Sequence, residues 1–432
     1  MPALRRGLGL VEMVAVAVSM MLGIGIFFGP SVTAREFPDA GMVLGLWAVG
    51  GAIAIAGAWV FGRLAALYPL SGGPYVYLRE AFGPLPAFLF AWTSMVVIGP
   101  TGIAVLATLL AANAGFVAPL SGLGLQLLAV WSIAAFAFVN VLGVVAGGRA
   151  QTALTLLKLA LIAALVVVLF AGSPPAAPAA AFAGGGRLSV AFVGVLFAYG
   201  GWEMSALASE EVRDARRTVP RSLLVGAAVV TLVYLAATGS YLAALGADGV
   251  ARAQALAPEA AARALPGGAG IVAIAVAISA AGTINALTLL VPRATFALAR
   301  DGLMPSALGA LGKRGTPAAA IALQGLLATL YLLTGAFVTI ATYDVLAVAV
   351  FVVLTSLALP ALRRRMSRPV GRAMLAAALG VAAVYVGFVA LSLVENTATA
   401  LVGLALVAAG VVPYAAMRRR FAPARATSSE PS

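Results

Sequence analysis

Glycine pairs at two places in the chain could expose peptide groups that bind a charged ligand. Gly23-Ile24-Gly25 lies at the centre of one apolar stretch, and Gly200-Gly201 lies at the centre of another. Glycine costs about 1 kcal/mol relative to alanine inside a helix, so paired glycines at the centre of a long apolar stretch require a reason. One reason is close packing of helices through small residues. The other is a break in each helix, because matched glycine-interrupted segments in two halves of a chain point to a binding site.

Breaks at these positions would expose backbone N–H groups in one helix and backbone carbonyls in the other. These groups carry opposite partial charges and would face the same site. In the first stretch, the backbone N–H groups of residues 24–26 would open the outer half-helix and suit a carboxylate. In the second, the carbonyls of Phe197, Ala198 and Gly200 would close a half-helix and suit an ammonium group. A carboxylate and an ammonium group on neighbouring atoms define an α-amino acid. Unpaired backbone at this depth must line a cavity or be occupied, so we expect a wet or filled site.

Lys158 is the one basic residue that lies well inside an apolar stretch. It follows Arg149 by nine residues, which is about 13 Å along a helix and places it near the middle of a roughly 30 Å hydrocarbon core. An isolated cation there costs on the order of 3 kcal/mol or more. The side chain therefore either extends toward the cytoplasmic surface along its own stem or has polar partners at mid-membrane.

Glu203 follows the second glycine pair directly. An acidic residue in the first turn of the following half-helix interacts favourably with the helix dipole. The same carboxylate could also carry a proton. The two roles are compatible.

The composition excludes a water-soluble enzyme. Of 432 residues, 63% are hydrophobic and 9% are charged, against roughly 25% charged in a soluble domain. Histidine and cysteine are both absent, which excludes Ser-His-Asp and Cys-His catalysis and thiolate or imidazole metal sites. We therefore expect no enzymatic activity, no cofactor and no metal. A channel is disfavoured because no ring of charged or carbonyl-rich repeats is present.

Twelve stretches of mainly apolar residues predict membrane-spanning helices, since a span needs about 20 such residues. They cover residues 10–33, 41–67, 85–113, 123–143, 151–171, 188–209, 220–245, 270–299, 317–336, 341–361, 371–393 and 398–417. An even number places both termini on one side, and most of the 27 Lys and Arg residues share that side, which assigns it to the cytoplasm. The net charge of +13 therefore reflects topology in a bacterial inner membrane, with lipid contacts and no nucleic-acid partner.

Five spans separate the starts of the two glycine-containing spans, so these two helices run in opposite directions. This pattern is expected of an inverted repeat of five plus five spans. We predict an all-α membrane protein with a first five-helix repeat over residues 8–171 and a second over 187–362. Two peripheral helices follow in 370–418, and residues 419–432 form a cytoplasmic tail expected to be disordered.

Four stretches, in order, resemble motifs of the amino acid–polyamine–organocation superfamily of permeases. Residues 23–27 are similar to G-S-G-I-F, and residues 68–75 with 79–84 are similar to P-x-S-G-G-x-Y…A-F-G. Residues 197–221 are similar to G-[WFV]-[DE]…E-E…P-R, and residues 292–305 to S-R…A-R-D-G-x-[LF]-P. The resemblance implies a leucine-transporter-like fold with broken helices 1 and 6, and a substrate site between spans 1, 3, 6, 8 and 10.

The resemblance also implies a role for Phe197, which would stack over the substrate and close the outer gate. Ordinary packing is the alternative for this phenylalanine. The predicted substrate-binding residues are Gly23, Ile24, Gly25, Ile26, Phe197, Ala198, Gly200 and Trp202.

Lys158 lies in a Q-x…K-L context that resembles sodium-independent members of the superfamily. In those members the lysine takes the place where related transporters bind sodium, and contacts span 1 carbonyls and a span 8 hydroxyl. Here the hydroxyl would be that of Ser279 or Thr283. The predicted coupling residues are Lys158, Glu203, Ser279 and Thr283.

Two departures from the family pattern bear on the substrate. Ile24 replaces the usual Ser or Thr, and Leu287 stands near the position where some members have a tryptophan platform for guanidinium groups. We therefore expect a sodium-independent secondary transporter of neutral, mostly apolar amino acids, either proton-coupled or exchanging. Export of neutral amino acids by the same fold and antiport of polyamines or cationic amino acids remain alternatives. The sequence leaves the oligomeric state open.

Overall fold

The computed structural model describes residues 4–115, 120–172, 182–366, 369–395 and 397–421. These residues form helices and no β-strand. Ten segments are long and apolar enough to cross a membrane: Ala40–Leu67, Pro84–Ala114, Gly122–Val141, Val144–Gly172, Val190–Glu211, Ala215–Arg252, Gly268–Arg300, Val345–Arg365, Arg372–Glu395 and Ala400–Met417. The two remaining predicted spans fall on shorter apolar helices, Leu10–Met21 and Ala318–Thr334. The chain is a multi-pass helical membrane protein. Residues 422–432 of the predicted tail lie outside the described residues.

The described residues from 4 to 172 form eight α-helices and two short irregular turns of helix. The helices are α1 (Leu10–Met21), α2 (Gly29–Glu36), α3 (Ala40–Leu67), α4 (Pro74–Phe82), α5 (Pro84–Thr93), α6 (Gly99–Ala114), α7 (Gly122–Val141) and α8 (Val144–Gly172). A 3₁₀ turn, η1 (Gly25–Phe27), lies between α1 and α2, and a π-helical turn, η2 (Ser94–Ile98), joins α5 to α6.

Where the structure describes the chain from residue 182 to residue 421, it contains ten α-helices. They are α9 (Leu188–Tyr199), α10 (Ala215–Arg252), α11 (Leu256–Ala264), α12 (Gly268–Leu290), α13 (Pro292–Arg300), α14 (Ala318–Thr334), α15 (Ala336–Leu362), α16 (Arg372–Glu395), α17 (Thr397–Ala408) and α18 (Val411–Phe421). Three 3₁₀ segments accompany them: η3 (Trp202–Glu211), η4 (Ser306–Gly309) and η5 (Arg363–Arg365).

Local sequence accounts for several helix starts. The Asp39 carboxylate accepts a hydrogen bond of 2.7 Å from the Met42 N–H and so caps α3. Pro74, Pro84 and Pro292 stand in the first turns of α4, α5 and α13, where a missing N–H carries no penalty.

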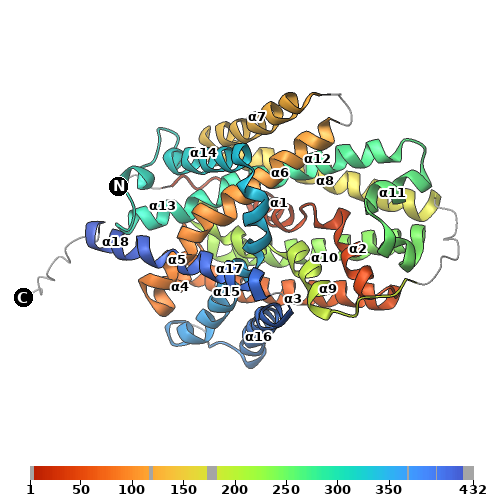
Figure 1. Cartoon of the computed structure of the whole chain (residues 1–432). Coiled ribbons are helices and arrows are strands. Elements are labelled where there is room, and N and C mark those ends of the chain that lie inside the picture. Colours follow the sequence, from red (N-terminus) through yellow and green to blue (C-terminus); the bar gives the residue numbers. More distant parts are fainter. Residues whose placement is uncertain (1–3, 116–119, 173–181, 367–368, 396, 422–432) are drawn as a thin grey trace, which may run out of the picture.

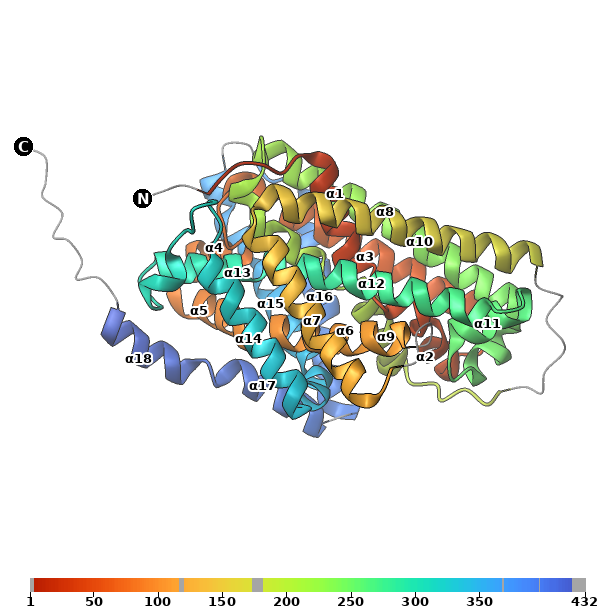
Figure 2. The ribbon, with the colours of Figure 1, turned by 90° about the horizontal axis from the view of Figure 1, so that it is seen from above.

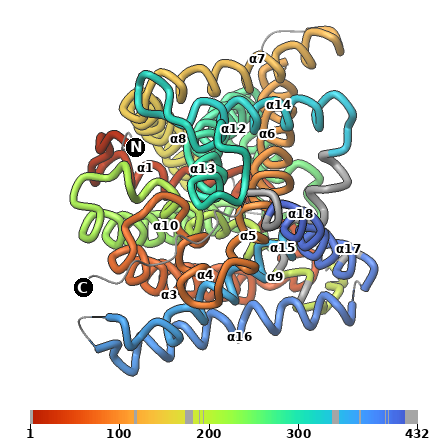
Figure 3. The backbone as a smooth tube through the Cα atoms, turned by 90° about the vertical axis from the view of Figure 1, so that its left-hand side faces the viewer, coloured from red at the N-terminus to blue at the C-terminus, as the bar shows by residue number. Residues whose placement is uncertain are grey.

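Helix α1 packs against α8, α10 and α12, and most of its residues are buried (Figure 1). Helices α8 and α12 are far apart in the sequence and lie side by side (Figure 2). Figure 3 shows α7 along one edge of the bundle and α16 along the opposite edge. The tertiary arrangement thus brings segments from both halves of the chain to α1.

Both glycine pairs interrupt their helices. Helix α1 ends at Met21, and η1 and α2 follow after a non-helical stretch. Helix α9 ends at Tyr199, after which Gly200 is extended with ψ 163° and Gly201 is left-handed with φ 104°. The segment after this second break is the 3₁₀ helix η3, whereas the sequence predicted a second α-helical half.

Candidate functional site

A cavity of about 200 Å³ lies between the two helix breaks. This volume far exceeds the roughly 10–15 Å³ that one water molecule needs. Its walls come from spans 1, 3, 6, 8 and 10, between which the family resemblance implies a substrate site, and from α16 in addition. The lining residues are Met20, Met21, Gly23, Ile24, Gly25, Ile98, Gly102, Val105, Leu106, Leu196, Phe197, Ala198, Gly200, Gly201, Glu203, Met204, Thr283, Leu287, Val345, Val348 and Tyr385.

The break in span 1 leaves backbone donors without partners. Within the described residues, the N–H groups of Ile24, Gly25 and Ile26 make no hydrogen bond. Ile24 and Gly25 line the cavity, and Ile26 is fully buried beside them. A Cβ atom on Gly25 would lie 2.8 Å from Ala198 Cβ, so glycine is required for this close approach of the two breaks.

The carbonyls at the span 6 break are only partly available. Phe197 O accepts a hydrogen bond from Gly200 N at 3.3 Å, and Ala198 O accepts one from the Tyr234 hydroxyl at 2.7 Å. The Gly200 carbonyl has no partner among the described residues. Of the three carbonyls that the sequence proposed for an ammonium group, Gly200 O is therefore the one left free.

Tyr234 of α10 ties the two breaks together. Its hydroxyl lies 2.6 Å from Met21 O and 2.7 Å from Ala198 O, near the ends of α1 and α9. The ring is fully buried and packs edge-on against Trp47 and Tyr199. Sequence reasoning missed this residue. The available signal was a tyrosine in the middle of an apolar span, since a buried tyrosine hydroxyl usually finds a partner.

Lys158 reaches the end of α1 from α8. Its ammonium Nζ lies 2.6 Å from Leu22 O, 3.1 Å from Ser19 Oγ and 3.3 Å from Thr283 Oγ1. The residue is 1% exposed, so its ammonium group does not extend to the surface. The three oxygens satisfy the three donors of the ammonium group.

The structure distinguishes the two hydroxyls that the sequence offered for Lys158. Thr283 contacts Nζ directly, whereas the Ser279 hydroxyl donates to Gly23 O at 3.0 Å. Ser279 thus holds the same non-helical stretch without touching the lysine at hydrogen-bond distance. Sequence reasoning did not identify Ser19, the third oxygen partner.

Glu203 has the geometry expected of a capping residue. Its carboxylate accepts a hydrogen bond of 3.0 Å from the N–H of Gly201, at the start of η3. The residue is 5% exposed and also lines the cavity. Capping and contact with the cavity are thus combined in one side chain.

The two aromatic residues proposed for the site lie differently. Phe197 lines the cavity, is 42% exposed and stands 6.2 Å from Phe28 between ring centroids. Trp202 does not line the cavity and is buried edge-on against Phe61, at 4.7 Å between centroids. Trp202 therefore packs η3 against α3. The predicted contact with substrate would require Trp202 to line the cavity, and it does not.

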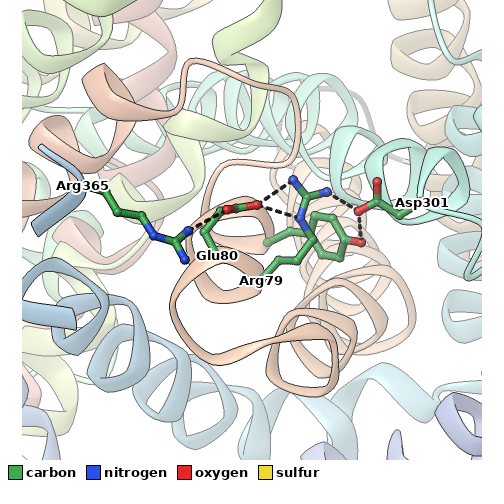
Figure 4. Close-up of polar contacts among 5 residues, drawn as sticks. Arg79, Glu80, Asp301 and Arg365 are labelled. Carbon is green, nitrogen blue, oxygen red and sulfur yellow. Dashed lines mark hydrogen bonds and ion pairs between the residues drawn. The ribbon is translucent and has the colours of Figure 1, made fainter. Parts of the chain in front are cut away.

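A chain of charged side chains joins three segments outside the cavity (Figure 4). Arg365 contacts Glu80 at 3.0 Å, Glu80 contacts Arg79 at 3.1 Å, and Arg79 pairs with Asp301. The Tyr75 hydroxyl donates to Asp301 at 2.5 Å. Burial, followed by the nearby Asp301 charge, raises the pKa of Tyr75, which therefore stays protonated as a donor.

Two acidic residues at the end of η3 extend these contacts. Glu211 makes a fully buried pair with Arg293, at 2.7 Å and 3.1 Å. Glu210 pairs with Arg300 at 3.0 Å. Both partners belong to α13, so these ion pairs hold η3 against the last part of span 8. Both acidic residues thus have partners far along the chain.

Comparison with known proteins gives the family to which the chain belongs. The sequence model of the family described as amino acid permease matches residues 8–413. The chain belongs to this family, whose members are transporters and not enzymes.

Two human relatives illustrate the similarity. The chain is 31% identical to the human b(0,+)-type amino acid transporter 1 over 385 residues, which are 85% of this chain and 79% of the relative. It is 32% identical to the human large neutral amino acids transporter small subunit 2 over 358 residues, or 79% of this chain and 66% of the relative.

Proposed function

We propose that this protein is a sodium-independent secondary transporter of neutral amino acids, driven by protons or by exchange. The observation that carries the proposal is the set of unpaired N–H groups at Ile24 and Gly25, which line a cavity beside the free Gly200 carbonyl. The N–H groups suit the substrate carboxylate and the carbonyl suits its ammonium group. The largely apolar wall, and the name of the large neutral amino acids transporter, favour a neutral side chain.

The remaining assignments belong to the same proposal. Ten of the twelve spans would form the two inverted repeats over 8–171 and 187–362. The other two would be the peripheral helices in 370–418, and both termini would lie in the cytoplasm of a bacterial cell. Phe197 would act as the outer gate. Lys158 and Glu203 would handle the coupling proton, with Ser279 and Thr283 holding the lysine and the span 1 break.

Uptake into proteoliposomes tests this function. We expect radiolabelled leucine to accumulate when a pH gradient is imposed or when the vesicles are preloaded with unlabelled leucine. Unlabelled leucine should compete strongly, and arginine and putrescine weakly. Strong competition by arginine or putrescine would support the cationic alternative, which the Glu203 carboxylate in the cavity would serve. Counterflow and export assays in the same vesicles separate uptake from efflux.

Transport should persist when sodium is replaced by choline. The Lys158 ammonium group already occupies a site made of Leu22 O, Ser19 Oγ and Thr283 Oγ1, so a sodium ion is not needed there. We expect initial rates in the two salts to agree within about twofold, because exposed charges respond alike to either ion at equal ionic strength. Strict dependence on sodium would contradict the proposed role of Lys158.

A further inference from the structure

Helix α16, which the sequence placed at the periphery, contributes a side chain to the central cavity. Tyr385 is 6% exposed and lines the cavity together with Gly201, Glu203 and Val348. The helix itself runs along one edge of the bundle (Figure 3) and packs against α3, α9 and α15. Tyr385 thus brings a hydroxyl to the span 6 break from outside the two repeats.

The Tyr385 hydroxyl has no hydrogen-bond partner among the residues that the structure describes. Tyr234, the other tyrosine beside the breaks, has two carbonyl partners. A buried hydroxyl without a partner is unfavourable, and such groups are normally satisfied by protein or by bound molecules. Because Tyr385 lines the cavity, its hydroxyl is free to form a hydrogen bond with a molecule bound there.

Tyr385 and Glu203 form one polar corner in an apolar cavity. Both side chains line the same cavity, whose other lining residues are nearly all apolar. The other hydroxyl of the cavity wall, that of Thr283, is occupied by Lys158 and by the carbonyls of Ser19 and Ser279. Among the described lining residues, Tyr385 and Glu203 are therefore the polar side chains that can still receive a ligand.

We propose that Tyr385 is a specificity-determining residue whose hydroxyl forms a hydrogen bond with the side chain of the amino acid substrate. This inference rests on the proposed function, in which the helix breaks hold the α-carboxylate and α-ammonium groups. A carboxamide tail complements the corner, because its NH₂ group can donate to Glu203 while its oxygen accepts from the Tyr385 hydroxyl. The cavity would thus accept neutral amino acids with a carboxamide side chain, such as glutamine, beside apolar ones of similar length, such as methionine.

Replacing Tyr385→Phe tests this assignment, since it removes the hydroxyl and keeps the ring. We measure KM and kcat for glutamine and for methionine in proteoliposomes. The ratio of the glutamine KM to the methionine KM should rise about 3- to 10-fold, the range for loss of one hydrogen bond to a neutral group. Methionine transport also reports that the variant has folded.

Tyr241→Phe is the matched control. Tyr241 of α10 is 1% exposed, its hydroxyl also lacks a partner, and it does not line the cavity. This variant should keep the wild-type ratio. A Tyr385→Phe variant whose two KM values shift by one common factor, or not at all, would overturn the assignment.

Transport of methionine, glutamine and leucine by the wild-type protein is a second test, and it separates this assignment from the proposed function. If it transports methionine and rejects glutamine, or if Tyr385→Phe changes only the competition by arginine, the carboxamide assignment is wrong while the proposed function stands. If it transports neither amino acid and leucine also fails, the proposed function itself is wrong.

Discussion

Replacing Lys158 by alanine should reduce amino acid uptake about tenfold or more, since hydrogen bonds to a charged group contribute about 1.5–3 kcal/mol each. The ammonium group holds Leu22 O, Ser19 Oγ and Thr283 Oγ1 together, and Leu22 lies in the non-helical stretch after α1. Without it, the span 1 break loses its hydrogen-bonded link to α8. Initial uptake rates under a pH gradient, normalised to protein in the vesicles, measure the effect.

Lys313 provides the control for this variant, because it is the other lysine of the chain and is exposed in a loop. Lys313→Ala should transport at the wild-type rate. Gel filtration in detergent establishes that both variants are folded. Normal, pH-dependent uptake by Lys158→Ala would remove Lys158 from the coupling mechanism.

Replacing Gly25 by valine should lower substrate affinity about 100-fold, equivalent to losing about two charge-assisted hydrogen bonds. The valine Cβ would lie 2.8 Å from Ala198 Cβ and 2.9 Å from Ala198 Cα. Backbone atoms cannot yield as a flexible side chain can, so the two breaks must separate. The added methyl groups would also cover the N–H groups of Ile24 and Gly25. Equilibrium binding of radiolabelled leucine to purified protein measures affinity without requiring translocation.

Gly45→Val is the matched control, since Gly45 is exposed on α3 and a Cβ there would meet no atom within 4 Å. It should bind leucine with wild-type affinity. Retained affinity in Gly25→Val would count against a carboxylate site at the span 1 break. Loss of affinity in both variants would instead indicate a general effect of valine on folding.

The features that the sequence determined by itself are those that depend on neighbours along the chain. Apolar stretches of sufficient length form helices in a membrane, because every backbone polar group must be satisfied internally. Glycine pairs weaken a helix wherever it packs, and both pairs here interrupt their helices. Most site residues that the sequence named accordingly line the cavity or lie directly beside it.

The tertiary structure decided which groups meet across the bundle. Thr283 contacts Lys158 from 125 residues away, and Tyr234 reaches Met21 O from 213 residues away. Glu211 forms an ion pair with Arg293, and Trp202 packs against Phe61 instead of lining the cavity. Hydropathy gives the extent of each helix along the chain, but these apolar helices have no pronounced polar face to fix their rotation. Rotation and depth are set by packing against neighbouring helices, so the partners of a side chain follow only once all helices are in place.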